Sequence, residues 1–187
     1  MEPVSLQTAR VELSAPTPAD TGAIFSTCQD PEVQRWTTVP SPYTRTHAEE
    51  FVALTGQWWA DDAEYAWAIR AETGFSGMIS LRRTQAGEAE IGYWLGASAR
   101  GRGLLAEAGA AVLDWGFDPE GGALERIMWR AMAGNVASAR TACALGFRYE
   151  GLLRRGLRME SGGVDGWIAG LLSTDDRAPH PWPVLAD

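Results

Sequence analysis

The sequence predicts one α+β domain with a mixed, mostly antiparallel sheet of about seven strands and about four helices. Short segments in which apolar and polar residues alternate recur between connections of turn length. Residues 104–117 instead place apolar side chains at helical spacing. The 187 residues, 45% apolar and 21% charged, are typical of a globular domain with a core of ordinary size.

The first part of the chain alternates between short elements and proline-containing breaks. Residues 10–13 alternate as a short strand. Residues 20–28 follow as a helix with Ile24 facing inward. The prolines between residues 31 and 42 mark an irregular stretch. The Thr-x-x-Glu motif at residues 46–49 then resembles a capping box and predicts the start of a second helix.

Three strands follow in quick succession, at residues 65–70, 75–81 and 89–95. The segment between the first two, residues 72–74, has hairpin length, and residues 85–88 form a similar turn. These connections are too short for a crossover helix, so we expect the three strands to be antiparallel.

The second half combines two helices with three more strands. Gly146 suits the C-terminal cap of the second of these helices. The predicted elements are a helix at 104–117, a strand at 126–132, a helix at 136–145, and strands at 147–157 and 164–172 around a turn at 161–163. We expect one domain over residues 1–173 and a Pro-containing tail over residues 174–187 that docks loosely or is disordered.

Composition and charge exclude several functions. The net charge of −8 and the lack of a long basic stretch argue against nucleic-acid binding. No apolar run approaches the ~18 residues of a membrane span, and no secretory signal is visible, so a cytoplasmic location is expected. The two cysteines and two histidines are scattered, so we expect no metal site and no Cys/His-based catalysis.

The candidate for chemistry is the loop Arg100-Gly101-Arg102-Gly103, between a strand and a helix. The first N–H groups of a helix have no partner within it, and the helix dipole favours an anion in front of them. Two glycines leave room for a phosphate, and two arginines add positive charge. A Gly-rich turn with two solvated arginines is the alternative. Neither a Walker motif nor a GxGxxG loop is present.

Four motifs in this order resemble the GNAT superfamily of N-acetyltransferases, and its RimJ/RimL type in particular. They are Glu90-Ile-Gly-Tyr-Trp-Leu95, Arg100-x-x-Gly103-x-Leu105, Asn135-x-x-Ser138 and Leu145-Gly146-Phe147. The resemblance runs from about Ala9 to Leu172 and implies the GNAT fold. Leu105 departs from it, because the family usually has a small residue there.

The resemblance implies acetyl transfer from acetyl-CoA to a primary amine, such as a protein N-terminus or a small-molecule amine, by direct attack in a ternary complex. The family binds the pyrophosphate of CoA on backbone N–H groups of the loop. In this family the pantetheine arm of CoA lies between two splayed strands, which correspond to residues 89–95 and 126–132. The implied binding residues are Tyr93, Trp94, Leu95, Arg100, Gly101, Arg102, Gly103, Leu104, Leu105, Asn135 and Ser138.

Three residues are candidates for catalysis by the same resemblance. Ser138 would protonate the leaving thiolate, unless its hydroxyl merely bonds the helix backbone one turn back. Glu90 or Asp165 would accept the proton of the amine, unless each is a solvated charge at a strand end. A water chain to backbone carbonyls is a third route. Asn135 either binds the pantetheine arm or only caps its helix.

The acceptor is less defined than the donor. Four aromatic residues fall where this family borders its acceptor pocket, although packing in the core or on the surface is an alternative for each. These are Trp36, Tyr43, Trp58 and Trp59. A homodimer is possible by the same resemblance. A non-catalytic module of the same fold that binds acyl-CoA is the alternative function.

Overall fold

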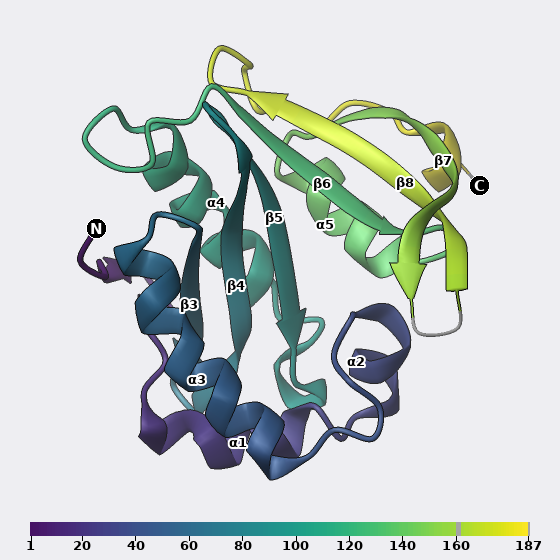
Figure 1. The fold of residues 1–187 in the computed structure, drawn as a ribbon. Helices are drawn as coiled ribbons and strands as arrows, with labels where there is room; N and C mark the ends of the chain where they lie inside the picture. The colour runs from purple at the N-terminus through teal and green to yellow at the C-terminus, as the bar shows by residue number, and fades with distance from the viewer. Residues whose placement is uncertain (160–161, 187) are drawn as a thin grey trace. The chain divides into compact units, whose positions relative to one another are not determined.

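The computed structural model describes residues 1–159 and 162–186 (Figure 1). Within these ranges the chain forms eight strands in one sheet, in the order β1-β2-β3-β4-β5-β6-β8-β7, and five α-helices. The β5–β6 pair is parallel, and the pairs β1–β2, β2–β3, β3–β4, β6–β8 and β7–β8 are antiparallel. The predicted α+β class with a mixed, mostly antiparallel sheet is therefore confirmed.

The chain divides into two compact units, which are described separately. Residues 1–83 and 92–112 form the first unit, and residues 84–91 and 113–187 form the second. Three elements contribute residues to both: β4 (Gly74–Gln85), β5 (Glu88–Leu95) and α4 (Leu104–Phe117). The domain boundary at residue 173 stays a prediction.

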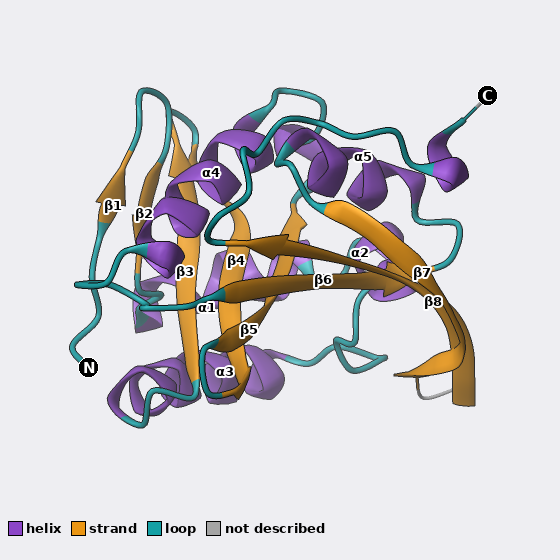
Figure 2. Cartoon of the chain, turned by 90° about the horizontal axis from the view of Figure 1, so that it is seen from above, coloured by secondary structure: helices purple, strands orange, loops and turns teal. Residues whose placement is uncertain are grey.

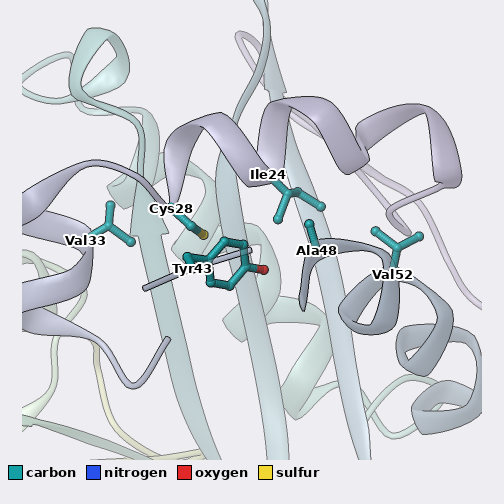
Figure 3. Packing of buried hydrophobic residues seen from close by; sticks show 6 residues of the cluster. All are labelled: Ile24, Cys28, Val33, Tyr43, Ala48 and Val52. Carbon is teal, nitrogen blue, oxygen red and sulfur yellow. The ribbon is translucent and has the colours of Figure 1, made fainter. Parts of the chain in front are cut away.

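In the first unit, two helices and the strand that follows them enclose the core. Its elements are β1 (Leu6–Gln7), β2 (Glu12–Ser14), α1 (Thr21–Thr27), α2 (Pro31–Trp36), α3 (Arg45–Ala60) and β3 (Glu64–Ala71). Helix α3 packs against both α1 and β3 (Figure 1). One core cluster of this unit consists of Ile24, Cys28, Val33, Tyr43, Ala48 and Val52 (Figure 3). Ile24 is fully buried, as predicted.

Two predictions for this unit are wrong. Residues 31–36 form helix α2, although the prolines suggested an irregular stretch. Pro31 occupies the first turn, where its missing N–H has no helical partner to lose, and Asp30 caps the helix by accepting from the Glu32 N–H. The capping box of α3 is formed by Thr44 and His47. There the imidazole Nδ1 takes the place of the expected glutamate by accepting from the Thr44 N–H.

In the second unit, one strand of a long antiparallel pair lies beside β6 and pairs with every residue of β6. Its elements are β6 (Arg126–Met132), α5 (Val136–Ala144), β7 (Arg148–Met159) and β8 (Gly162–Leu172). Figure 2 shows β7 and β8 as a long, curved pair of strands, and α5 packs against β6. The bounds of β6 match the prediction. Of the predicted turn at 161–163, Ser161 lies outside the described residues.

The C-terminal tail is more firmly docked than expected. Trp182 is 3% exposed, and its indole N–H donates to the Phe147 carbonyl. Gly146 lies so close to the tail that a Cβ there would approach Arg177 Cα to 2.4 Å. An aromatic side chain in a proline-containing segment therefore makes the tail part of the core of this unit.

Candidate active site

The loop before α4 has two residues in the left-handed backbone region. Gly101 has φ +71° and Gly103 has φ +74°, a conformation that costs residues with a Cβ roughly 1–2 kcal/mol. The room that the glycines leave for a phosphate stays a prediction. A Cβ on Gly101 would meet no atom within 4 Å, and one on Gly103 would lie 3.5 Å from Arg10 Nη2. The glycines therefore serve the shape of the loop, which turns the chain into the helix.

Backbone N–H groups line the start of α4. In the described part of the chain, the N–H groups from Gly101 to Ala106 have no acceptor, and the helical ladder begins with Glu107 N–H donating to the Gly103 carbonyl. Unpaired donors at the positive end of a 14-residue helix favour an anion in front of them. The binding of a CoA phosphate at this position stays a prediction.

The two loop arginines differ in what they contact. Arg100 Nη2 donates to Asp30 Oδ2 at 2.6 Å, and Arg100 Nε donates to the Leu95 carbonyl at 3.1 Å. Its charge is therefore already paired, and these contacts tie it to Asp30 and to the end of β5, whereas its role in CoA binding stays a prediction. Arg102 is exposed and its side chain contacts no acceptor among the described residues. Of the two, Arg102 is the cation available to a bound phosphate.

Sequence reasoning missed two residues beside this loop, Arg10 and Glu107. Arg10 Nη1 donates to the Arg102 carbonyl at 2.9 Å, and Arg10 Nε donates to Glu107 Oε2 at 2.6 Å. A cavity of about 450 Å³ opens beside them. Its lining residues are Gln7, Ala9, Arg10, Val11, Glu12, Arg70, Ala71, Glu72, Arg102 and Leu104. No local pattern indicated this contact, because 97 positions separate Arg10 from Glu107.

The remaining residues of the predicted donor site in the first unit are half-buried or buried. Tyr93, Trp94 and Leu95 end β5 and are half-buried, whereas Leu104 is buried and Leu105 is half-buried. The Trp94 ring packs against Phe75, with ring centroids 5.9 Å apart. The Trp94 side chain thus packs within this unit, and the binding role of residues 93–95 stays a prediction.

Two of the four acceptor-pocket aromatics belong to the core instead. Trp59 is fully buried and donates its indole N–H to the Ala66 carbonyl. Tyr43 is buried beside Cys28 (Figure 3), and burial raises the pKa of the Cys28 thiol to about 11. Trp58 packs edge-on against Phe51, and Trp36 bonds Glu32 on its own helix. The pocket interpretation is therefore wrong for Trp59 and Tyr43.

In the second unit, β5 and β6 pair over four residues only. The ladder runs from Glu88 opposite Arg126 to Ile91 opposite Trp129. The rest of β6 continues to pair with β8 on its other edge. The pairing thus stops at the middle of β5, and the binding of the pantetheine arm along this strand stays a prediction.

The candidate bases are both engaged. Glu90 Oε2 accepts from Arg130 Nη2 at 2.5 Å, and this hydrogen bond raises the pKa of Arg130 further above its ordinary value. Asp165 is exposed and lies inside β8 rather than at its start. Its Oδ1 accepts from the Arg155 N–H at 2.7 Å, where β7 is bulged and Arg155 has φ +50°. Both carboxylates thus have structural partners, and both stay predictions as bases.

Asn135 and Ser138 are brought together at the start of α5. Asn135 caps the helix, because its Oδ1 accepts from the Ser138 N–H at 3.2 Å. The half-buried Ser138 Oγ accepts from the indole N–H of Trp129 at 3.1 Å. An indole only donates, so this contact occupies a lone pair of the hydroxyl oxygen. The role of Ser138 as a proton donor stays a prediction.

Residues 10–148 match the acetyltransferase (GNAT) domain family. The chain belongs to this family. The fold and the family implied by the motifs are confirmed, and no finding supports the alternative of a non-catalytic module. Among the described residues, no group of three or more His, Cys, Asp or Glu side chains is arranged to hold a metal ion. No helix in these ranges has the length and apolarity that a bilayer crossing requires.

Known relatives agree with this assignment. The probable N-acetyltransferase YjcK of Bacillus subtilis is 29% identical over 120 residues, which cover 62% of this chain and 65% of that protein. Mycobacterium smegmatis RimJ, solved with a CoA-disulfide, has a TM-score of 0.83 at 22% identity and covers 92% and 90% of the two chains. RimL, the ribosomal L7/L12 N-acetyltransferase, solved with coenzyme A, also reaches 0.83 at 18% identity, over 92% and 100%.

Proposed function

We propose that the chain transfers an acetyl group from acetyl-CoA to a primary amine. The observation that carries this proposal is the row of unpaired N–H groups from Gly101 to Ala106 at the start of α4, in a chain of the GNAT family. A pyrophosphate satisfies such donors and the helix dipole together. Arg102 adds a positive charge, because the charge of Arg100 is already paired with Asp30.

The reaction needs no covalent intermediate, because a thioester is already activated. The amine nitrogen loses its proton and attacks the thioester carbonyl carbon, and the C–S bond then breaks. In our proposal a backbone N–H of residues 93–95 stabilises the oxyanion, and Asn135 binds the pantetheine arm. Ser138 passes a proton to the departing thiolate and regains one from the nitrogen that has added to the carbonyl carbon, and the Trp129 indole keeps its hydroxyl oriented for this step.

The proton of the amine has three candidate routes. Glu90 and Asp165 each have a partner in the folded chain, which weakens them as proton acceptors. We therefore favour a chain of waters leading to backbone carbonyls. A variant pair, Glu90→Gln and Asp165→Asn, tests this choice: a retained acidic limb in the pH profile of kcat/KM supports the water route, and its loss in either variant assigns the base.

The test of the proposal is an acetyl-transfer assay on the purified chain with a panel of amines that includes peptide N-termini and small amines. Acetylated product is measured by mass spectrometry. All 16 basic residues of this chain are arginines, so no lysine of the enzyme contributes acetylated background. We expect turnover with at least one amine class. CoA binding by calorimetry without turnover on any amine would instead support a non-catalytic module, and no binding would refute the donor site.

Two finer expectations stay predictions: a cytoplasmic location and a homodimer. Sedimentation of the purified chain with and without CoA tests the second.

A further inference from the structure

The turn between β1 and β2 contacts the first turn of α4 through one carboxylate. Glu107 Oε1 accepts from the Thr8 hydroxyl at 2.6 Å and from the Arg10 backbone N–H at 2.8 Å. Glu107 Oε2 accepts from Arg10 Nε at 2.6 Å. The hydrogen bond from Thr8, followed by those from Arg10, holds the pKa of Glu107 below its ordinary value. Glu107 is thus a charged anchor for Arg10.

Arg10, held by Glu107, also contacts the loop of residues 100–103. Its Nη1 donates to the Arg102 carbonyl at 2.9 Å. The C=O of Arg102 and the N–H of Gly103 belong to one planar trans peptide and point in opposite directions. Fixing the carbonyl toward Arg10 therefore aims the Gly103 N–H away from Arg10.

Arg10 also neutralises a charge that would oppose the ligand. Glu107 lies in the first turn of α4, where a bare carboxylate would repel a pyrophosphate bound at the same helix end. The guanidinium pairs with it directly. The pair has no net charge, so Arg102 and the helix dipole set the potential that the anion meets.

We infer that Arg10 is a positioning residue for the pyrophosphate end of the donor site, with Glu107 as its anchor. The inference rests on the proposed function, because it names acetyl-CoA as the ligand. Arg10 acts on the ligand through the peptide between Arg102 and Gly103 and by masking Glu107. It contributes nothing to the thioester end.

Arg10→Ala is a suitable test, because the variant leaves no void in the core. The Arg10 side chain is 54% exposed and lines the open cavity beside the loop. The matched control is Arg45→Ala, which removes an arginine paired with Glu49 on α3 of the same unit. Two donors are compared: acetyl-CoA and S-acetyl-pantetheine, which has the same thioester and no pyrophosphate.

We expect Arg10→Ala to raise the KM for acetyl-CoA about 10-fold, the value of one lost charge-assisted hydrogen bond. The kcat at saturating acetyl-CoA and the kcat/KM for S-acetyl-pantetheine should stay within about 2-fold of wild type. Arg10→Lys should lie between, since an ammonium cannot bond both Glu107 and the Arg102 carbonyl in the same fork. An equal loss on both donors, or no loss on either, would overturn the inference.

A second variant separates the two effects of Arg10. Glu107→Gln in the Arg10→Ala background removes the unmasked carboxylate, so we expect it to recover part of the lost affinity for acetyl-CoA. A further loss would contradict the electrostatic part. If wild type shows no turnover with either donor, the proposed function fails instead, and calorimetric affinities for CoA and pantetheine in the same variants still decide the role of Arg10.

Discussion

The phosphate loop of the first unit and the surroundings of Ser138 in the second differ in what carries their chemistry. In the loop, the groups that we propose to bind the ligand are backbone N–H groups at a helix start, and the Arg100 side chain contacts Asp30 instead. Around Ser138, the proposed chemistry rests on one hydroxyl, which accepts a hydrogen bond from Trp129, whose ring packs against Trp182 of the tail. A backbone site is visible in a short motif, whereas a side-chain site depends on contacts between distant residues.

Cys28 lies in the first unit and Cys143 in the second, so the alkylation of each thiol reports on one unit. The slow alkylation of Cys28 is the largest effect that we expect. Cys28 is 1% exposed and its pKa is raised to about 11 by burial, so at pH 8 about one thiol in a thousand is ionised. Cys143 is half-buried and donates to the His180 carbonyl. An exposed thiol of ordinary pKa is about one quarter ionised at pH 8. We therefore expect Cys28 to react with iodoacetamide about 200-fold more slowly than such a thiol, and more slowly than Cys143, measured by peptide mass spectrometry.

The same labelling, repeated at increasing denaturant concentrations, shows whether the two units unfold together. A single transition for both thiols means that the units unfold cooperatively, and an earlier loss of Cys143 protection means that the second unit, with its docked tail, opens first. Equal labelling rates in native buffer would contradict the buried environment of Cys28.

Gly103→Glu tests the loop and should weaken CoA binding about 100-fold by calorimetry. A residue with a Cβ at φ +74° costs roughly 1–2 kcal/mol, or about tenfold in a binding constant. The added carboxylate opposes the pyrophosphate and competes with Glu107 for Arg10, which contributes the rest.

The matched control for this change is Gly74→Glu. Gly74 has φ +90° and open space around it, so a glutamate there bears the same strain and the same charge at the first residue of β4. We expect Gly74→Glu to lower the melting temperature and to leave the affinity for CoA unchanged. Wild-type affinity in Gly103→Glu would refute the phosphate-binding role of the loop.

Ser138→Ala tests the other region and should reduce kcat about 30-fold while changing the affinity for CoA less than about 2-fold. The expected loss is below the usual range for general acids, because a thiolate is a good leaving group even without a proton. Stopped assays at saturating acetyl-CoA measure it.

Thr141 supplies the control on the same helix. Its hydroxyl donates to the Ala137 carbonyl one turn back, which is the structural role that sequence reasoning left open for Ser138. Thr141→Ala should keep the wild-type kcat. A wild-type kcat in Ser138→Ala as well would remove Ser138 from the mechanism.

Local patterns predicted the elements whose signals lie within a few residues. The period of α4 and the alternation of β6 gave their observed bounds, and Gly146 follows the last turn of α5 with φ +91°. Helix α2 was missed because Pro31 was taken for a break, although Asp30 before it is a good cap. The Thr44–His47 box was missed because histidine is not the usual partner.

The contacts between distant residues could not be predicted from the sequence, because their partners lie far apart in the chain. Arg10 meets Glu107 across 97 positions, and Trp182 meets Phe147 across 35. Neither pair repeats at a helical or strand period, so no local pattern indicates it. The motifs therefore placed the N–H donors and Ser138, whereas folding alone reveals the residues that orient them.

Trp129→Phe has the smallest effect and decides whether the second region depends on a side-chain partner at all. The change keeps an aromatic ring against Trp182 and removes the N–H that donates to Ser138 Oγ. We expect kcat to fall about 3-fold, because one neutral hydrogen bond contributes about 0.5–1.5 kcal/mol.

Trp182→Phe serves as the control: it loses the bond to the Phe147 carbonyl, lowers stability and leaves kcat near wild type. In the Ser138→Ala background, Trp129→Phe should have no further effect on kcat, since the group that it orients is gone. An additive loss in the double variant would mean that Trp129 acts through packing, and Ser138 would then depend on its helix alone.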